Sequence, residues 1–129
     1  MEIRKYNKST DERQLMEMID QEEGWNYAQE TLAEKYKAAL ETSITYVAYE
    51  GDVLCGYSRS LNDFDTYIYV CDLLVMPAYR GKEIGKKLME CIYHDYPGQL
   101  VYVMSDVDEY YEKVNYKRIG SIFEVSCRE

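Results

Sequence analysis

A short segment rich in cations and glycines is the most chemically suggestive part of this 129-residue sequence. It contains Arg80, Gly81, Lys82, Gly85, Lys86 and Lys87. It follows an apolar run and opens a helical pattern, which predicts a turn from a strand into a helix. The first turn of a helix offers free N–H groups and a positive dipole end, and glycine lets a bulky anion approach the backbone. The segment therefore predicts a phosphate site, although an ordinary amphipathic helix with a solvated lysine face has a similar composition.

A single carboxylate interrupts the apolar run before this segment. Asp72 lies within residues 66–75, whose nearly continuous apolar character predicts a central strand. A carboxylate in such a strand is costly unless it is paired or functional. Two roles are open for Asp72: an ion pair with Arg59 on the neighbouring strand, or a base that deprotonates a substrate ammonium directly or through water.

Two motifs resemble those of the GCN5-related N-acetyltransferase (GNAT) superfamily. Residues 80–85 read Arg-Gly-Lys-Glu-Ile-Gly and resemble its acetyl-CoA-binding signature, [R/Q]-x-x-G-x-[G/A]. Residues 110–117 resemble its late Y-E-K-x-G-F element, and the predicted element order also matches over nearly the whole chain. The segment from Gly56 to Gly85 looks most like small, bacterial-type, single-domain members that act on small molecules.

The resemblance implies acetyl-CoA as co-substrate and assigns residues to it. The cofactor-binding residues would be Leu74, Val75, Met76, Arg80, Gly81, Lys82, Glu83, Ile84, Gly85 and Lys86. Tyr111 matches the family tyrosine that protonates the leaving thiolate, and a backbone N–H near Val75 would stabilise the developing oxyanion. Tyr111 could instead pack the last helix on the sheet. Trp25 and Tyr27 would line the acceptor pocket, or simply hold the first two helices together.

Two residues depart from the family pattern. Glu83 stands where the family usually has glycine, and its carboxylate would repel a pyrophosphate unless it points to solvent. Asn115 replaces the glycine of the late motif, but asparagine tolerates the left-handed conformation better than most residues. No metal site is expected, because the four cysteines form no C-x-x-C pair and have no histidine at ligand spacing.

The expected function is transfer of an acetyl group from acetyl-CoA to a primary amine by direct attack in a ternary complex. The acidic balance and the 15 tyrosines favour a small cationic or aryl-alkyl amine. The alternatives are a non-catalytic acyl-CoA-binding or regulatory module on the same fold, which Glu83 favours, and a protein-interaction domain without a CoA site.

Hydrophobic periodicity predicts the elements that must position these residues. Strands are expected at residues 1–6, 44–50, 53–61, 66–75, 99–104 and 117–125, the last forming one or two strands. A capping box at Ser9 and Glu12 opens a helix, Asn26 caps a second, a third starts at Lys82, and residues 106–114 form a fourth. The fold class is mixed α/β: a twisted, mostly antiparallel sheet of six to seven strands with helices on both faces. The resemblance adds one parallel strand pair that splays at the cofactor site.

The charge of −9, from 15 basic and 24 acidic residues, limits the possible partners. Binding to nucleic acid or to an anionic membrane would require a basic face, so neither is an expected partner. Residues 1–129 are expected to form one domain. Scattered cysteines and the lack of a leader pattern indicate a reducing cytoplasm. A homodimer is possible, because dimers are frequent in the family.

Overall fold

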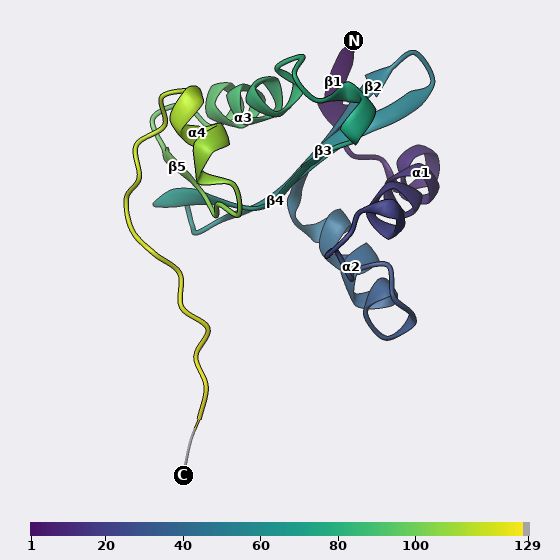
Figure 1. Ribbon diagram of the computed structural model, residues 1–129, viewed down its shortest axis with the longest axis horizontal. Helices are drawn as coiled ribbons and strands as arrows, with labels where there is room; N and C mark the ends of the chain where they lie inside the picture. The colour runs from purple at the N-terminus through teal and green to yellow at the C-terminus, as the bar shows by residue number, and fades with distance from the viewer. Residues whose placement is uncertain (128–129) are drawn as a thin grey trace.

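The computed structural model describes residues 1–127, which form one five-stranded sheet with helices on both faces (Figure 1). The strands are β1 (Glu2–Lys5), β2 (Ile44–Glu50), β3 (Val53–Asn62), β4 (Tyr67–Val75) and β5 (Leu100–Val103). The helices are α1 (Lys8–Gln21), α2 (Glu30–Thr42), α3 (Ile84–Asp95) and α4 (Asp108–Lys113), with a short 3-10 helix, η1, at Pro77–Tyr79. The strand order is β1-β2-β3-β4-β5, and only the β4–β5 pair is parallel.

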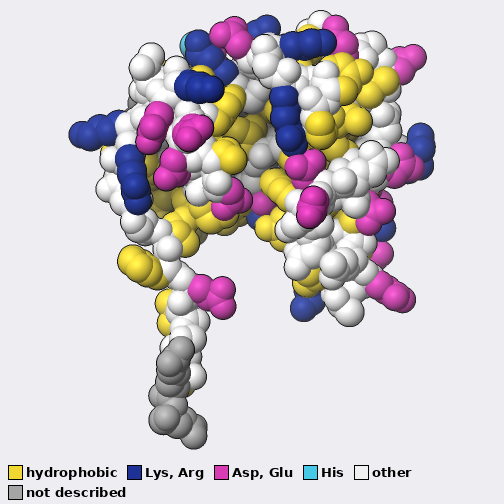
Figure 2. Space-filling model, in the orientation of Figure 1, with side chains coloured by type: hydrophobic (Ala, Val, Ile, Leu, Met, Phe, Trp, Pro, Cys, Tyr) yellow, Lys and Arg dark blue, Asp and Glu magenta, His cyan; other side chains and the backbone are white. Residues whose placement is uncertain are grey.

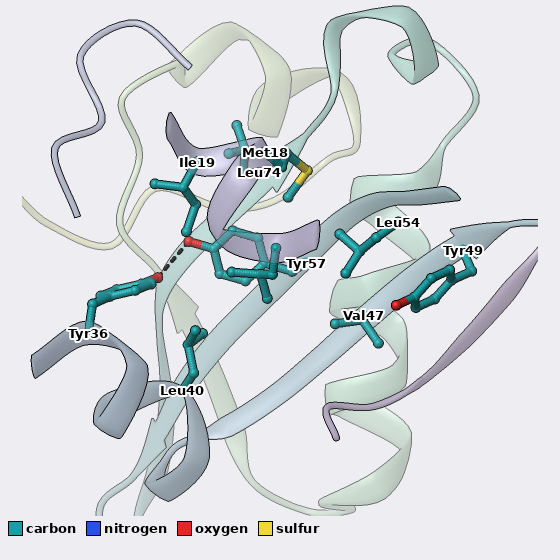
Figure 3. Packing of buried hydrophobic residues seen from close by; sticks show 10 residues of the cluster. Met18, Ile19, Tyr36, Leu40, Val47, Tyr49, Leu54, Tyr57 and Leu74 are labelled. Carbon is teal, nitrogen blue, oxygen red and sulfur yellow. Dashed lines mark hydrogen bonds between the residues drawn. The ribbon is translucent and has the colours of Figure 1, made fainter. Parts of the chain in front are cut away.

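Two hydrophobic cores lie on opposite faces of the sheet. On one face, α1 and α2 pack against β2, β3 and β4, with Leu15, Leu40 and Tyr57 almost completely buried. Figure 3 shows Tyr36 of α2 pointing toward Tyr57 of β3 across this core. On the other face, α3 packs through Leu88 and neighbouring apolar residues. The mixed sheet with helices on both faces is confirmed.

The strand count differs from the expectation, because residues 117–125 form no strand in the described chain. A strand exists only where its backbone groups pair with a neighbour. Within residues 1–127 no segment pairs with these residues, so they do not join the sheet although their sequence has a β-type pattern.

Two helix starts also differ from the expectation. Asn7, not Ser9, caps α1: its side chain accepts the Ser9 N–H at 3.0 Å, and the Asp11 carboxylate accepts the Asn7 N–H at 2.7 Å. Helix α2 begins at Glu30, because Asn26 starts a separate turn that the N–H of residue 29 closes at 3.1 Å.

Candidate active site

The strands β4 and β5 separate halfway along β4, and the opening between them is the base of the candidate site. Residues 67–70 of β4 pair with β5, whereas residues 72–75 pair only with β3. Because backbone groups along a strand point alternately to its two sides, some peptide groups of residues 71–75 face the opening. The predicted splayed parallel pair is therefore confirmed.

An extra residue in β4 redirects the side chains that follow it. Arg59 of β3 pairs with Asp72, but the next residue of β3 pairs with Val70, so Cys71 forms a bulge. A one-residue bulge reverses the alternation of side chains between the faces. Val70 accordingly packs under α3, while Leu74 packs against α1 and α2. Asp72 shares the face of Leu74 and is directed toward α2.

A cavity of about 710 Å³ extends from this opening to the start of α3 and to the loop after α1. Figure 2 shows hydrophobic side chains in this hollow, with cationic and anionic side chains around it. The predicted residues that line it are Trp25, Tyr27, Asp72, Leu74, Val75, Arg80, Gly81, Glu83, Ile84, Gly85, Lys86 and Tyr111. Two others do not: Met76 packs between the two cores, and the Lys82 ammonium lies 5.4 Å from the centre of the Tyr79 ring. The volume suits a small-molecule ligand.

The start of α3 forms one end of the cavity. Helix α3 begins at Ile84, two residues later than predicted, because Gly81 and Glu83 have positive φ angles of 84° and 63°. Left-handed backbone suits glycine but costs another residue about 1 kcal/mol or more. The N–H groups of residues 84–86 are in the first turn and lack intrahelical acceptors. Those of Ile84 and Gly85 are available to an anion at the cavity wall, whereas that of Lys86 faces the Tyr110 hydroxyl.

Two cations flank this helix start. The Arg80 guanidinium donates to the Val75 carbonyl and to the Glu22 carboxylate, each at 2.9 Å, and its side chain remains 50% exposed. Lys86 forms only a long, exposed ion pair with Glu90 at 4.0 Å. Exposed pairs of this kind contribute little stability, so both cations can turn toward a bound anion at low cost.

Two tyrosines of α4 form the facing wall. A methyl group added at Gly85 would lie 2.5 Å from the Tyr110 hydroxyl, so the close approach of α4 to α3 requires glycine there. The Tyr111 ring packs edge-on against Tyr110 at 5.1 Å and nearly parallel to Tyr116 at 6.1 Å. Burial, assisted by neighbouring charges, raises the pKa of Tyr111 to about 12. Its phenol therefore carries a proton throughout the physiological pH range.

Asp72 is the centre of a buried polar network on the opposite side of the opening. Its Oδ2 atom accepts hydrogen bonds from the Arg59 Nε and the Tyr36 hydroxyl, both at 2.7 Å. The Tyr57 hydroxyl lies 2.5 Å from that of Tyr36 (Figure 3). Burial and the charge of Asp72 raise the pKa of Tyr36 well above its ordinary value. The expected ion pair with Arg59 is present, and the same carboxylate also lines the cavity.

Aromatic rings enclose the end of the cavity next to Asp72. Tyr27 stacks on Tyr36 with ring centres 4.2 Å apart and planes at 10°. Trp25 packs edge-on against Tyr27 and Tyr57, at 6.0 and 6.4 Å. Trp25 and Tyr27 thus line the cavity and also join the loop after α1 to α2 and the sheet, so the two expectations for this pair are compatible.

Several residues that line the cavity carry no signal in the sequence that would have predicted them. They include Glu22, Cys71, Asp106 and Tyr110. Glu22 and Asp106 lie outside both motifs and reach the cavity only through tertiary packing. The small residue at position 85 was the one available signal for Tyr110, because it indicates a close neighbour without identifying it.

The comparisons with known proteins agree with this geometry. Residues 41–118 match the family model of the acetyltransferase (GNAT) domain, which is more than half of the chain. The chain therefore belongs to the GNAT acetyltransferase family. No curated protein matches it in sequence.

Solved structures share its fold at low sequence identity. An aminoglycoside 6'-acetyltransferase of type Ii has a TM-score of 0.77 at 22% identity, with 93% of this chain and 85% of that chain covered. An aminoglycoside N-acetyltransferase in complex with CoA has a TM-score of 0.75 at 12% identity, covering 98% and 94%. A GNAT-family acetyltransferase from Streptococcus pneumoniae TIGR4 has a TM-score of 0.67 at 19% identity, covering 96% and 97%. At these identities the likeness establishes the fold.

None of the helices in residues 1–127 is both long and apolar enough to cross a bilayer.

Proposed function

We propose that the chain is an acetyl-CoA-dependent N-acetyltransferase acting on a small cationic or aryl-alkyl amine. The observation that carries this proposal is the opposite character of the two ends of one cavity. One end offers first-turn N–H groups with Arg80 and Lys86, and the other offers Asp72 enclosed by aromatic rings. An anionic cofactor and a cationic acceptor would meet where β4 and β5 separate.

The residues at the start of α3 suit the pyrophosphate of acetyl-CoA. The free N–H groups of Ile84 and Gly85 and the two flanking cations would hold it. The pantetheine arm would lie along Leu74 and Val75, whose backbone borders the opening. The bound co-substrate supplies an acetyl group activated as a thioester.

The residues around the opening have separate roles in the proposed transfer. Asp72 would accept a proton from the acceptor ammonium, directly or through water, which frees the nitrogen lone pair. The amine would attack the carbonyl carbon, forming the C–N bond while the C–S bond breaks. A backbone N–H near Val75 would stabilise the developing oxyanion. The raised pKa of Tyr111 keeps its phenol protonated, and the phenol would donate this proton to the departing thiolate. The proton that the new amide nitrogen must lose would restore the phenol.

The aminoglycoside acetyltransferases among the structural neighbours support a cationic amine acceptor, since aminoglycosides are polycationic. One of these neighbours was solved with CoA, which supports the choice of co-substrate. The aromatic walls around Asp72 are suited to a flat or cationic group, because aromatic faces attract cations.

The test is release of free CoA with a panel of amines, using the wild type, Tyr111→Phe and the matched control Tyr116→Phe. We expect turnover on at least one cationic amine. Tyr111→Phe should lower kcat about 100-fold with little change in the KM for acetyl-CoA. Tyr116→Phe removes the hydroxyl of the stacked neighbour and should leave kcat within about twofold.

The alternative of a non-catalytic acyl-CoA-binding module is favoured by one observation, the Glu83 carboxylate at the cavity wall. Acetyl-CoA binding without turnover on any amine would support this alternative. Absence of a thermal shift with millimolar acetyl-CoA would reject both functions.

A further inference from the structure

An ion pair connects two walls of the cavity that lie 58 residues apart in the sequence. The Arg80 guanidinium, in the turn before α3, donates to the Glu22 carboxylate at 2.9 Å. Glu22 caps the end of α1 and starts the loop that carries Trp25 and Tyr27. Both partners of the pair line the cavity. The pair therefore joins the segment proposed to hold the cofactor to the segment that forms the aromatic wall.

The backbone of Glu22 is held independently of this ion pair. Its N–H donates to the Ile19 carbonyl of α1 at 3.1 Å, and its carbonyl accepts the Trp25 N–H at 3.2 Å. Trp25 in turn packs edge-on against Tyr57 of β3, with ring centres 6.4 Å apart. Because these contacts do not involve Arg80, the Glu22 carboxylate keeps its place at the cavity when its partner moves.

One edge of the Arg80 guanidinium is fully occupied. Its Nε donates to the Val75 carbonyl and its Nη2 to Glu22, each at 2.9 Å. Arginine binds phosphate most strongly when two parallel N–H groups of one edge donate to it. A pyrophosphate held through this edge must displace Glu22, and two anions beside one guanidinium also repel each other. Glu22 and the cofactor therefore compete for Arg80.

Displacement leaves the Glu22 carboxylate shielded from water and without a partner. The Glu22 side chain is 22% exposed, whereas that of Arg80 is 50% exposed and can turn through solvent. Within residues 1–127 the Glu22 side chain forms no other hydrogen bond or ion pair. An unpaired carboxylate is costly in such a place, so a cation that reaches it regains the interaction that Arg80 gave up.

We propose that Glu22 binds a cationic group of the acceptor, and that it becomes available only when the cofactor takes Arg80. In the structure the Arg80 guanidinium occupies the Glu22 carboxylate. When pyrophosphate binds Arg80, the carboxylate is released to the cavity and accepts a hydrogen bond from the acceptor ammonium. Co-substrate and acceptor then each raise the affinity of the other by the same factor, as linkage requires. This inference rests on the proposed function and adds to it a substrate contact that depends on the cofactor.

Titration calorimetry with CoA tests the competition for Arg80. Glu22→Gln removes the competing anion and should bind CoA about threefold to tenfold more tightly than the wild type. Glu23→Gln is the matched control, because it loses the same charge from an exposed neighbour that does not line the cavity, and it should bind CoA as the wild type does. The remaining comparison separates competition from a general effect of charge. When Arg80→Met is already present, adding Glu22→Gln should change the CoA affinity by less than about twofold.

Kinetics on the amine that turns over best tests the release of Glu22. Glu22→Gln should raise the KM for the amine about tenfold, because a hydrogen bond between two charged groups is weakened, while kcat stays within about twofold. The same substitution thus binds the cofactor more tightly and the acceptor more weakly, which a merely structural role of Glu22 would not produce.

Two results would overturn the inference while leaving the proposed function intact. One is a CoA affinity that Glu22→Gln leaves unchanged, or changes equally with and without Arg80. The other is an amine KM that rises no more in Glu22→Gln than in Glu23→Gln. Failure of the proposed function looks different, because the wild type would then release no CoA with any amine, and the acceptor contact would be rejected along with it.

Discussion

Glu83 combines two unfavourable features in one residue. Its φ of 63° places an L-residue in the left-handed region, and its carboxylate lies at the wall where we propose that pyrophosphate binds. The family glycine at this position has neither feature, since it adopts positive φ freely and carries no charge. The backbone therefore keeps the geometry of a glycine turn, while the side chain adds a charge of the wrong sign for an anion site.

Substitutions at Glu83 can separate these two effects. Glu83→Gly removes both the carboxylate and the backbone strain, whereas Glu83→Gln removes only the charge. We expect both variants to bind acetyl-CoA about threefold to tenfold more tightly, because an unfavourable interaction of about 1 kcal/mol is lost. Only Glu83→Gly should also gain about 1 kcal/mol in the free energy of unfolding. Titration calorimetry and urea unfolding measure the two quantities, and an unchanged affinity in both variants would show that the carboxylate points away from the cofactor.

At the scale of elements, the Asp72 network joins α2 to the two longest strands. Tyr36 of α2 and Arg59 of β3 both donate to the same oxygen of Asp72 in β4. The bulge at Cys71 makes this possible, because it turns Asp72 to the α2 face. The network therefore fixes the position of Asp72 at the opening through α2 and β3.

A double-mutant cycle tests the structural part of that role. The Arg59 and Asp72 side chains are 15% and 4% exposed, so removing either partner leaves the other charge unpaired in a largely buried site. Asp72→Asn and Arg59→Met should each lower the free energy of unfolding by about 3 kcal/mol. The double variant should cost less than the sum by at least about 1 kcal/mol. Additive costs in urea unfolding would show that the two side chains do not stabilise each other.

At the scale of the molecule, local sequence patterns predicted the helices and strands better than the contacts between them. The bounds of β2 and the turn at Gly51 and Asp52 were predicted closely, because alternation and turn chemistry are local properties. The Arg59–Asp72 pair was also expected, since a carboxylate in an apolar strand requires a partner. The contact of Tyr110 with Gly85 and the lining role of Glu22 depend on packing between distant segments, which periodicity does not encode. The strand expected at residues 117–125 is absent because a strand requires a neighbour as well as a pattern.

One buried carboxylate connects the first part of the chain to the sheet. Asp11 of α1 is fully buried and accepts hydrogen bonds from Arg4 of β1 at 2.7 and 2.8 Å and from the Tyr49 hydroxyl of β2 at 2.7 Å. Burial alone would raise its pKa, but these hydrogen bonds outweigh burial and hold the pKa of Asp11 at about 2. The ionised carboxylate is thus part of what joins α1, β1 and β2.

The stability of the whole molecule should therefore depend on pH in a defined window. Because the folded-state pKa of Asp11 lies below its unfolded value of about 3.9, the ionised group stabilises the fold above that value. Its contribution, about 2 kcal/mol, should be lost as the pH falls from about 4 toward 2. Asp11→Asn should lower the free energy of unfolding at pH 7 by at least that amount and flatten its pH dependence in this window. Asp52→Asn, in the exposed β2–β3 turn, is the matched control and should retain the wild-type slope in urea unfolding. If Asp11→Asn kept that slope as well, carboxylates elsewhere would control the acid transition.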